Sequence, residues 1–240
     1  MRKGILEKEI IMEKKRSGYF ARSEITLWGI SVLLILVSFL VFDRENYLTL
    51  AASLIGVTSL IFNAKGNSFG QLLIVAFSVL YGIISYTSAY YGEMITYLGM
   101  TAPMAAFSLV SWLRNPYEGN RTEVAVNHLK GRELGFMLGL TAVVTVGFYF
   151  ILAYFHTANL APSTLSVATS FLAVYLTFRR SLLFALAYAA NDGVLILLWI
   201  LAARGNRSYL SVVVCFLVFL ANDIYGYVNW SKMEKRQQAA

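Results

Sequence analysis

Eight long apolar runs constrain the fold of this chain more than any other feature of the sequence. They are residues 25–42, 47–62, 69–90, 94–112, 134–155, 162–178, 181–203 and 208–230. A helix of roughly 20 apolar residues crosses the hydrocarbon core of a bilayer. Because 58% of the residues are hydrophobic and 14% are charged, we predict an all-α membrane protein with eight transmembrane helices.

Positive charges are distributed unevenly between the alternate connections. Of the 20 Lys and Arg residues, all but Arg44, Arg204 and Arg207 fall on one side of the predicted bundle. The positive-inside rule places the richer side in the cytoplasm. We therefore predict a multi-pass protein of the plasma membrane with both termini cytoplasmic. The net charge of +7 does not indicate nucleic-acid binding, because the basic residues do not line one face.

A weak internal repeat relates the second, third and fourth runs to the last three. A shift of 117 residues aligns 53–57 with 170–174, and a shift of 118 aligns Tyr81 with Trp199. This pattern predicts one N-terminal helix plus a 3+1+3 parallel-repeat core. The predicted parts are a basic cytoplasmic segment (1–24), an extra helix (25–42), a first bundle (47–112), a cytoplasmic loop (113–133), a linker helix (134–155), a second bundle (162–230) and a cytoplasmic tail (231–240).

Polar residues gather near the middle of several predicted helices. The most unusual are Asp192 and Asp223, because a carboxylate at the bilayer centre costs at least about 2.5 to 3.5 kcal/mol on insertion scales. Hydroxyl residues lie at a similar depth: Ser53, Thr58, Ser78, Thr101, Thr169 and Ser170. We expect Asp192 to face a substrate cavity. A polar bond between helices and a role in proton coupling are the alternatives.

Two helix faces carry the candidate binding residues. On residues 181–203, Asp192 lies four residues after Tyr188 and seven before Trp199, so a carboxylate is flanked by two aromatic rings on one face. On the last run, amide and hydroxyl groups share a face by similar spacing. The predicted substrate-binding residues are Tyr81, Tyr188, Asn191, Asp192, Trp199, Asn222, Tyr225 and Asn229.

Motifs of enzymes and of nucleotide-driven pumps are missing from the sequence. His128 and His156 fall in predicted loops without a catalytic partner, and Cys215 stands alone in an apolar run. No glycine-rich nucleotide loop appears. We predict that the chain is not an enzyme and needs no metal or cofactor. A solute transporter is favoured by the repeated bundles over a binding-only membrane receptor or a membrane-embedded enzyme.

Several motifs resemble those of the PnuC family of vitamin transporters. They are 81–86 (YGIISY), 91–94 (YGEM), Pro103-Met104, Trp112, Asn191-Asp192 with Trp199, and 222–230 (NDIYGYVNW). The resemblance runs from about Tyr47 to Arg236. It implies a fold similar to that of the SWEET sugar transporters, and import of nicotinamide riboside by facilitated diffusion with trapping by a cytoplasmic kinase for NAD biosynthesis. It also implies that aromatic and amide side chains near the centre bind the substrate.

The chain departs from the family pattern at positions near this predicted site. Ala105 and Leu109 stand where many members have Gln and Trp, and Ala185-x-x-Tyr188 stands where they have Trp-x-x-Trp. Relatives of the family carry thiamine, deoxynucleosides or riboflavin, so these substrates stay open beside nicotinamide riboside. A carboxylate between aromatic rings suits a cation, and both thiamine and nicotinamide riboside are cationic. The oligomeric state also stays open.

Overall fold

The structure, a computed structural model, describes residues 19–88 and 90–239. Within them, eight helical spans are long and apolar enough to cross a membrane, as predicted. Most of the predicted basic segment 1–24 lies outside the described residues. The helices are α2 (Arg22–Phe42), α3 (Tyr47–Ala64), α4 (Phe69–Thr87), α5 (Tyr91–Thr96), α6 (Ala102–Arg114), α7 (Gly131–Tyr154), α8 (Leu160–Phe178), α9 (Leu183–Ala203) and α10 (Leu210–Ala239).

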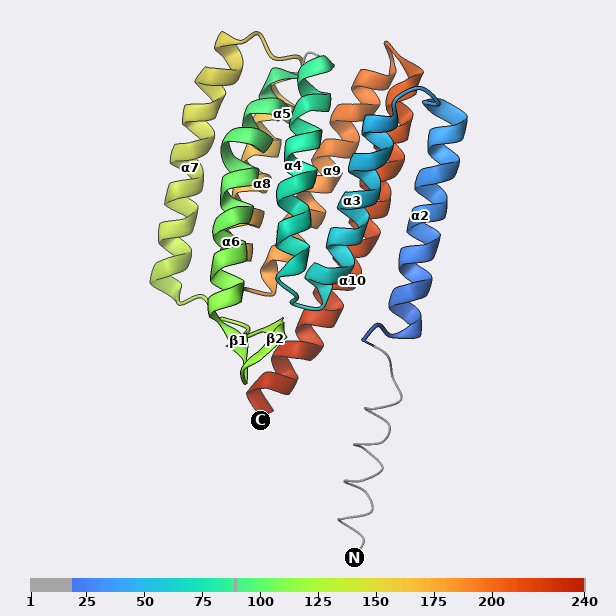
Figure 1. Cartoon of the computed structure of the whole chain (residues 1–240). Coiled ribbons are helices and arrows are strands. Elements are labelled where there is room, and N and C mark those ends of the chain that lie inside the picture. Colours follow the sequence, from blue (N-terminus) through green and yellow to red (C-terminus); the bar gives the residue numbers. More distant parts are fainter. Residues whose placement is uncertain (1–18, 89, 240) are drawn as a thin grey trace, which may run out of the picture.

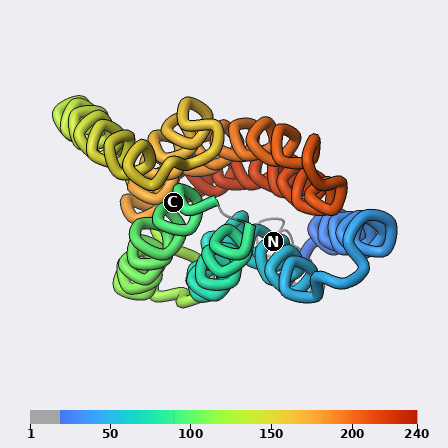
Figure 2. Tube along the Cα trace, turned by 90° about the horizontal axis from the view of Figure 1, so that it is seen from above, coloured from blue at the N-terminus to red at the C-terminus, as the bar shows by residue number. Residues whose placement is uncertain are grey.

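Six of these spans form a closed ring of two three-helix bundles. In the first bundle α4 packs between α3 and α6, and in the second bundle α9 packs between α8 and α10. The bundles meet where α3 contacts α10 and where α6 contacts α8. Seen from above, the two bundles form two facing rows (Figure 2). Outside the ring, α2 packs on α3 and α10, and α7 packs on α8. This is the predicted extra helix plus a 3+1+3 core.

Equivalent turns after α3 and α8 reveal the repeat in the backbone. Gly66 and Arg180 end these turns, and both adopt the left-handed conformation, with φ of 67° and 57°. The two positions differ by 114 residues. The shift of 117 that the sequence suggested for the preceding helices was therefore wrong by three residues, nearly one helical turn. Such an error keeps the apolar face of a helix almost unchanged, which explains why the repeat was still detectable.

Two equivalent tryptophans close the ring next to these turns. The Trp230 indole N–H donates to the Asn63 carbonyl at 2.8 Å, and the Trp112 indole N–H donates to the Thr177 carbonyl at 2.9 Å. Each hydrogen bond crosses from one bundle to the other, and the two rings lie 5.5 Å apart at their centroids. The tryptophans therefore tie the bundles together symmetrically at one end of the ring.

The fourth membrane span is not a regular α-helix. Between α5 and α6, residues Tyr97–Thr101 form a π-helical turn just before Pro103. Proline lacks a backbone N–H, and its ring collides with the carbonyl four residues earlier, so a widened turn relieves the conflict. Tyr97 and Thr101 are buried there.

The loop between α6 and α7 contains a β-hairpin, which is the exception to the all-α fold. Strand β1 (Pro116–Tyr117) pairs antiparallel with β2 (Asn120–Val124). The two turn residues, Glu118 and Gly119, have φ of 47° and 75°, as the tight turns that match strand twist require. The hairpin lies at the same end of the molecule as the C-terminus of α10 (Figure 1). We call this end the hairpin end and the opposite one the far end.

Helix α10 extends well beyond its apolar run. The run ends at Trp230, but the helix continues to Ala239, so the predicted tail 231–240 is largely helical. This extension is polar and carries Glu234, Arg236 and Gln237, which bond to the end of strand β2 and to the loop that follows it. A search for apolar runs misses such a segment, because its side chains bond to polar groups of a loop and do not face lipid.

Candidate functional site

A small closed cavity lies at the centre of the ring. Its volume is about 30 Å³, room for roughly one water molecule. A cleft of about 270 Å³ between α2 and α3 is larger, but it lies outside the ring and its lining is almost entirely apolar. The residues that line the central cavity are Leu60, Ile74, Phe77, Tyr97, Thr101, Ser170, Tyr188, Asn191, Asp192, Phe216, Phe219 and Asp223.

Three of the eight predicted binding residues line this cavity together. Tyr188, Asn191 and Asp192 project from one face of α9 at i, i+3 and i+4 spacing. Asn191 and Asp192 are each only 3% exposed. Polar groups that are buried this deeply are normally hydrogen-bonded or have a function. The face of α9 that helical spacing singled out in the sequence thus lines the cavity.

The Asn191 carboxamide is held in place from α8. Its Oδ1 accepts hydrogen bonds from Thr169 Oγ1 at 2.8 Å and from Ser170 Oγ at 2.9 Å. Ser170 also lines the cavity. These two bonds use the amide oxygen and leave the amide nitrogen available as a donor. The side chain is therefore positioned before any ligand arrives.

Two carboxylates, from Asp192 on α9 and Asp223 on α10, share the cavity. In residues 19–88 and 90–239 neither carboxylate forms an ion pair, and Asp192 Oδ2 has no hydrogen-bond partner. The same residues contain no cluster of three His, Cys, Asp or Glu side chains that could hold a metal ion. Burial of an unpaired ionised carboxylate costs several kcal/mol. An organic cation that entered the cavity would offset part of this cost.

Aromatic side chains close the cavity toward both ends. Toward the far end, the Trp199 indole N–H donates to the Tyr81 hydroxyl, and the Tyr81 ring packs 4.3 Å from that of Tyr97. Tyr81 and Trp199, both predicted binding residues, thus lie behind the cavity wall and not in it. Toward the hairpin end, Trp112 and Trp230 are both buried. The cavity is occluded from both sides.

The last three predicted binding residues have partners elsewhere. Asn222 Nδ2 donates to Ser31 Oγ on α2 at 3.0 Å, and the Tyr225 hydroxyl donates to Glu24 Oε1 on α2 at 3.3 Å. Asn229 Nδ2 donates to the last carbonyl of α3 at 2.7 Å. All three lie on one face of α10, as their spacing predicts, but this face packs against α2 and α3 and does not line the cavity.

Sequence reasoning did not select most of the aromatic residues that line the cavity. Phe77, Phe216 and Phe219 look like ordinary members of apolar runs, so no sequence signal marks them. Tyr97 belongs to the π turn, which the sequence did not predict. Asp223 carried a usable signal, because it follows an Asn at the same predicted depth as Asp192.

Comparisons with known proteins agree with this architecture. Residues 46–232 match the family model described as "Nicotinamide mononucleotide transporter". The nicotinamide riboside transporter PnuC of Neisseria mucosa is 27% identical over 215 residues, which are 88% of this chain and 81% of that protein. The PnuC of Haemophilus influenzae is 23% identical over 192 residues, 80% of this chain and 82% of that protein.

A solved structure shares the fold. The crystal structure of the vitamin B3 transporter PnuC matches with a TM-score of 0.80 and 23% identity, over 94% of this chain and 97% of that chain. Its agreement extends beyond the ring to nearly the whole chain. With a family model that matches residues 46–232, the chain belongs to the nicotinamide mononucleotide transporter family and is a multi-pass membrane transporter.

Proposed function

We propose that the protein imports nicotinamide riboside by facilitated diffusion across the plasma membrane, through the central cavity. The two sequence relatives are named as nicotinamide riboside transporters. The observation in this chain that best supports the proposal is that two carboxyl groups, Asp192 and Asp223, line one aromatic-walled cavity and have no ion-pair partner among the described residues. The nicotinamide ring of the riboside is a cation, and both carboxylates and aromatic faces attract cations.

Each cavity residue of α9 has a defined part in this proposal. The Asp192 carboxylate faces the cationic ring, and the Tyr188 ring supplies a cation–π contact worth roughly 0.5 to 2 kcal/mol. The Asn191 amide nitrogen donates to a ribose hydroxyl or to the carboxamide oxygen of the substrate. Tyr81 and Trp199 act indirectly, because they close the path between the cavity and the far end.

Movement of the two bundles relative to each other would admit the substrate. A cavity of about 30 Å³ is far smaller than a nucleoside, so binding requires the lining to separate. We propose that the bundles rock, with the hairpin end facing the cytoplasm because most Lys and Arg residues lie there. The shift is powered only by differential binding. Since passive exchange does not trap the substrate, net uptake depends on a cytoplasmic kinase.

Thiamine is the strongest alternative substrate. It is also a cationic aromatic vitamin, and the replacement of the family's Trp-x-x-Trp by Ala185-x-x-Tyr188 changes the wall that meets the ligand. Calorimetric titration of the purified protein with nicotinamide riboside, thiamine, a deoxynucleoside and riboflavin tests the proposal. Tightest binding of nicotinamide riboside supports it, and tightest binding of thiamine would reassign the substrate. Binding of a neutral compound with no binding of either cation would refute the role of the carboxylates.

A further inference from the structure

A short segment that begins at the end of strand β2, residues 123–128, bonds to both bundles, and we call it the strap. The Val124 N–H donates to the Gly66 carbonyl at 3.0 Å, and the Asn127 N–H donates to the Arg180 carbonyl at 3.0 Å. Gly66 and Arg180 are the equivalent left-handed residues of the two repeat turns. The strap therefore joins the same point of each bundle across the hairpin end of the ring.

The second bundle holds the strap through side chains as well. Asn127 Nδ2 donates to the Arg179 carbonyl at 3.0 Å, and Arg180 Nε donates to the Ala125 carbonyl at 3.1 Å. The Arg180 guanidinium also donates to Ser111 Oγ on α6 of the first bundle at 2.9 Å, a bond that does not involve the strap. Hydrogen bonds from a charged donor are among the stronger ones in proteins. The strap is thus firmly fixed to the turn after α8.

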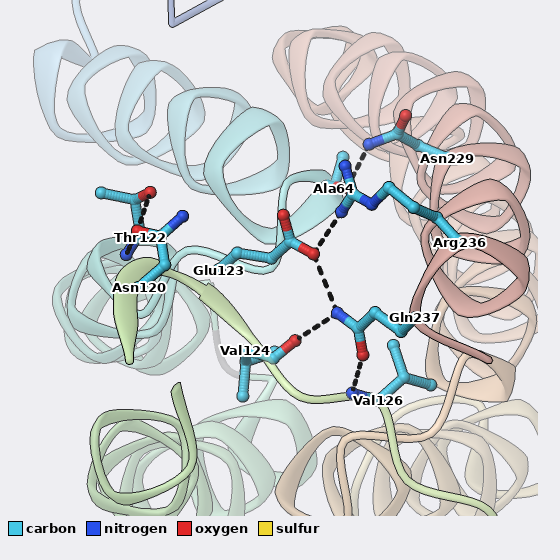
Figure 3. A network of polar contacts seen from close by, with 9 residues as sticks. All are labelled: Ala64, Asn120, Thr122, Glu123, Val124, Val126, Asn229, Arg236 and Gln237. Atoms are coloured by element: carbon cyan, nitrogen blue, oxygen red, sulfur yellow. Dashed lines mark hydrogen bonds and ion pairs between the residues drawn. The ribbon is translucent and has the colours of Figure 1, made fainter. Parts of the chain in front are cut away.

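The polar extension of α10 holds the strap from the other side (Figure 3). The Gln237 side chain accepts from the Val126 N–H at 2.8 Å and donates to the Val124 carbonyl at 3.1 Å and to the Glu123 carboxylate at 2.8 Å. Arg236 forms an ion pair with Glu123. Because α10 belongs to the second bundle, these contacts add to the attachment of the strap to that bundle.

The attachment to the turn after α3 is much slighter. In the described part of the chain, the hydrogen bond from Val124 to Gly66 is the one that joins the strap to this turn. The Val124 side chain is 1% exposed and belongs to the apolar cluster that contains Trp112 and Trp230. These tryptophans separate the strap from the cavity. The strap thus covers the path between the cavity and the hairpin end. Its weakest attachment is the hydrogen bond to Gly66.

We propose that the strap is a lid over the hairpin end of the transport path, and that it releases the turn after α3 each time the cavity opens toward this end. The inference rests on the proposed transport function. Rocking of the bundles must move the two repeat turns apart, and a strap bonded to both opposes that movement. The bond between Val124 and Gly66 breaks because the other turn, with α10, holds the strap through several bonds.

A disulfide across the weak attachment tests the proposal. A Cβ placed on Gly66 would stand 3.3 Å from Val124 Cγ1, close to the separation of roughly 3 Å between a Cβ and the partner sulfur implied by disulfide geometry. A side chain is tolerated in the left-handed conformation of the equivalent Arg180, with φ of 57°. Gly66→Cys with Val124→Cys is therefore expected to crosslink on oxidation, although any side chain at residue 66 is strained by its positive φ.

Uptake of nicotinamide riboside into proteoliposomes is the first readout. The oxidised double variant should lose at least ten-fold in rate, and reduction should restore the rate. The reduced double variant is the matched control, since it carries the same substitutions, and each single variant with oxidant controls for the native Cys215. Equal uptake by the crosslinked and reduced forms would overturn the proposal.

Amide hydrogen exchange of the purified protein gives a readout that needs no substrate. Oxidation should slow exchange in the hairpin-end turns of α8 and of α10, because opening is blocked. In a second variant, Gln237→Ala, which loses three strap bonds, exchange of the strap should rise several-fold. Unchanged exchange in both variants would refute the lid even if uptake were slow. If the wild-type protein did not take up nicotinamide riboside, the proposed substrate would be refuted. The lid would then be tested by the hydrogen-exchange result alone.

Discussion

Replacement of Asp192 by Asn should weaken the binding of a cationic substrate by about ten-fold to a hundred-fold. The side chain lines the cavity, is 3% exposed and has no ion-pair partner in the described residues. A unit charge about 5 Å from a carboxylate gains about 3 kcal/mol at an effective dielectric constant of about 20. Each 1.4 kcal/mol is about ten-fold in affinity. Because Asp223 keeps part of the attraction, the full value is an upper bound.

Calorimetry with two ligands makes this prediction specific. The dissociation constant of nicotinamide riboside should rise in Asp192→Asn, whereas that of its uncharged dihydro form should change less than three-fold. The melting temperature should stay equal or rise, because the substitution preserves the shape of the side chain and removes a buried carboxyl group that has no ion-pair partner in the described residues. Equal weakening of both ligands, or no weakening of the cation, would show that Asp192 serves packing between helices and not recognition of charge.

Three further substitutions concern the cavity wall and the residues packed behind it. Tyr188→Leu removes the π face at similar apolar volume, so affinity for the cation should fall several-fold in calorimetry, and wild-type affinity would exclude ring stacking. Trp199→Phe leaves the buried Tyr81 hydroxyl without its hydrogen-bond donor, which should lower the free energy of unfolding by roughly 1 to 3 kcal/mol. An unchanged melting curve would contradict the role of Tyr81 and Trp199 in closing the cavity toward the far end. In Gly56→Ala the new methyl would stand 2.2 Å from Phe219 Cζ, so the Phe219 ring must move and affinity should fall, whereas wild-type affinity and stability would show that the ring can move away freely.

The architecture was largely predictable because it depends on simple patterns. Eight apolar runs gave eight spans, and the parallel repeat was visible although its register was three residues off between Gly66 and Arg180. Tyr188, Asn191 and Asp192 line one cavity because helical spacing groups them on one face of α9. Depth and periodicity are both encoded locally in the sequence, so they need no knowledge of neighbouring helices.

What could not be predicted depends on how helices rotate against each other and on backbone groups. The α10 face with Asn222 and Asn229 looks as polar as the α9 face, but it packs against α2 and α3. Tyr97 faces the cavity through a π turn whose only sequence signal is Pro103. The strap bonds mainly through the peptide groups of residues 124–127, and peptide groups carry no residue-specific signal.

The central claim is passive transport of one cationic solute, and uptake into buffer-loaded proteoliposomes at zero membrane potential tests it most directly. With equal potassium and valinomycin on both sides, internal free nicotinamide riboside should rise to the external concentration and stop there. An imposed pH gradient should not change this endpoint, because the two cavity carboxylates, Asp192 and Asp223, lie at one depth and do not form a relay across the membrane. Accumulation several-fold above the external concentration under that gradient, abolished by a protonophore, would contradict the account and make the protein a proton-coupled transporter.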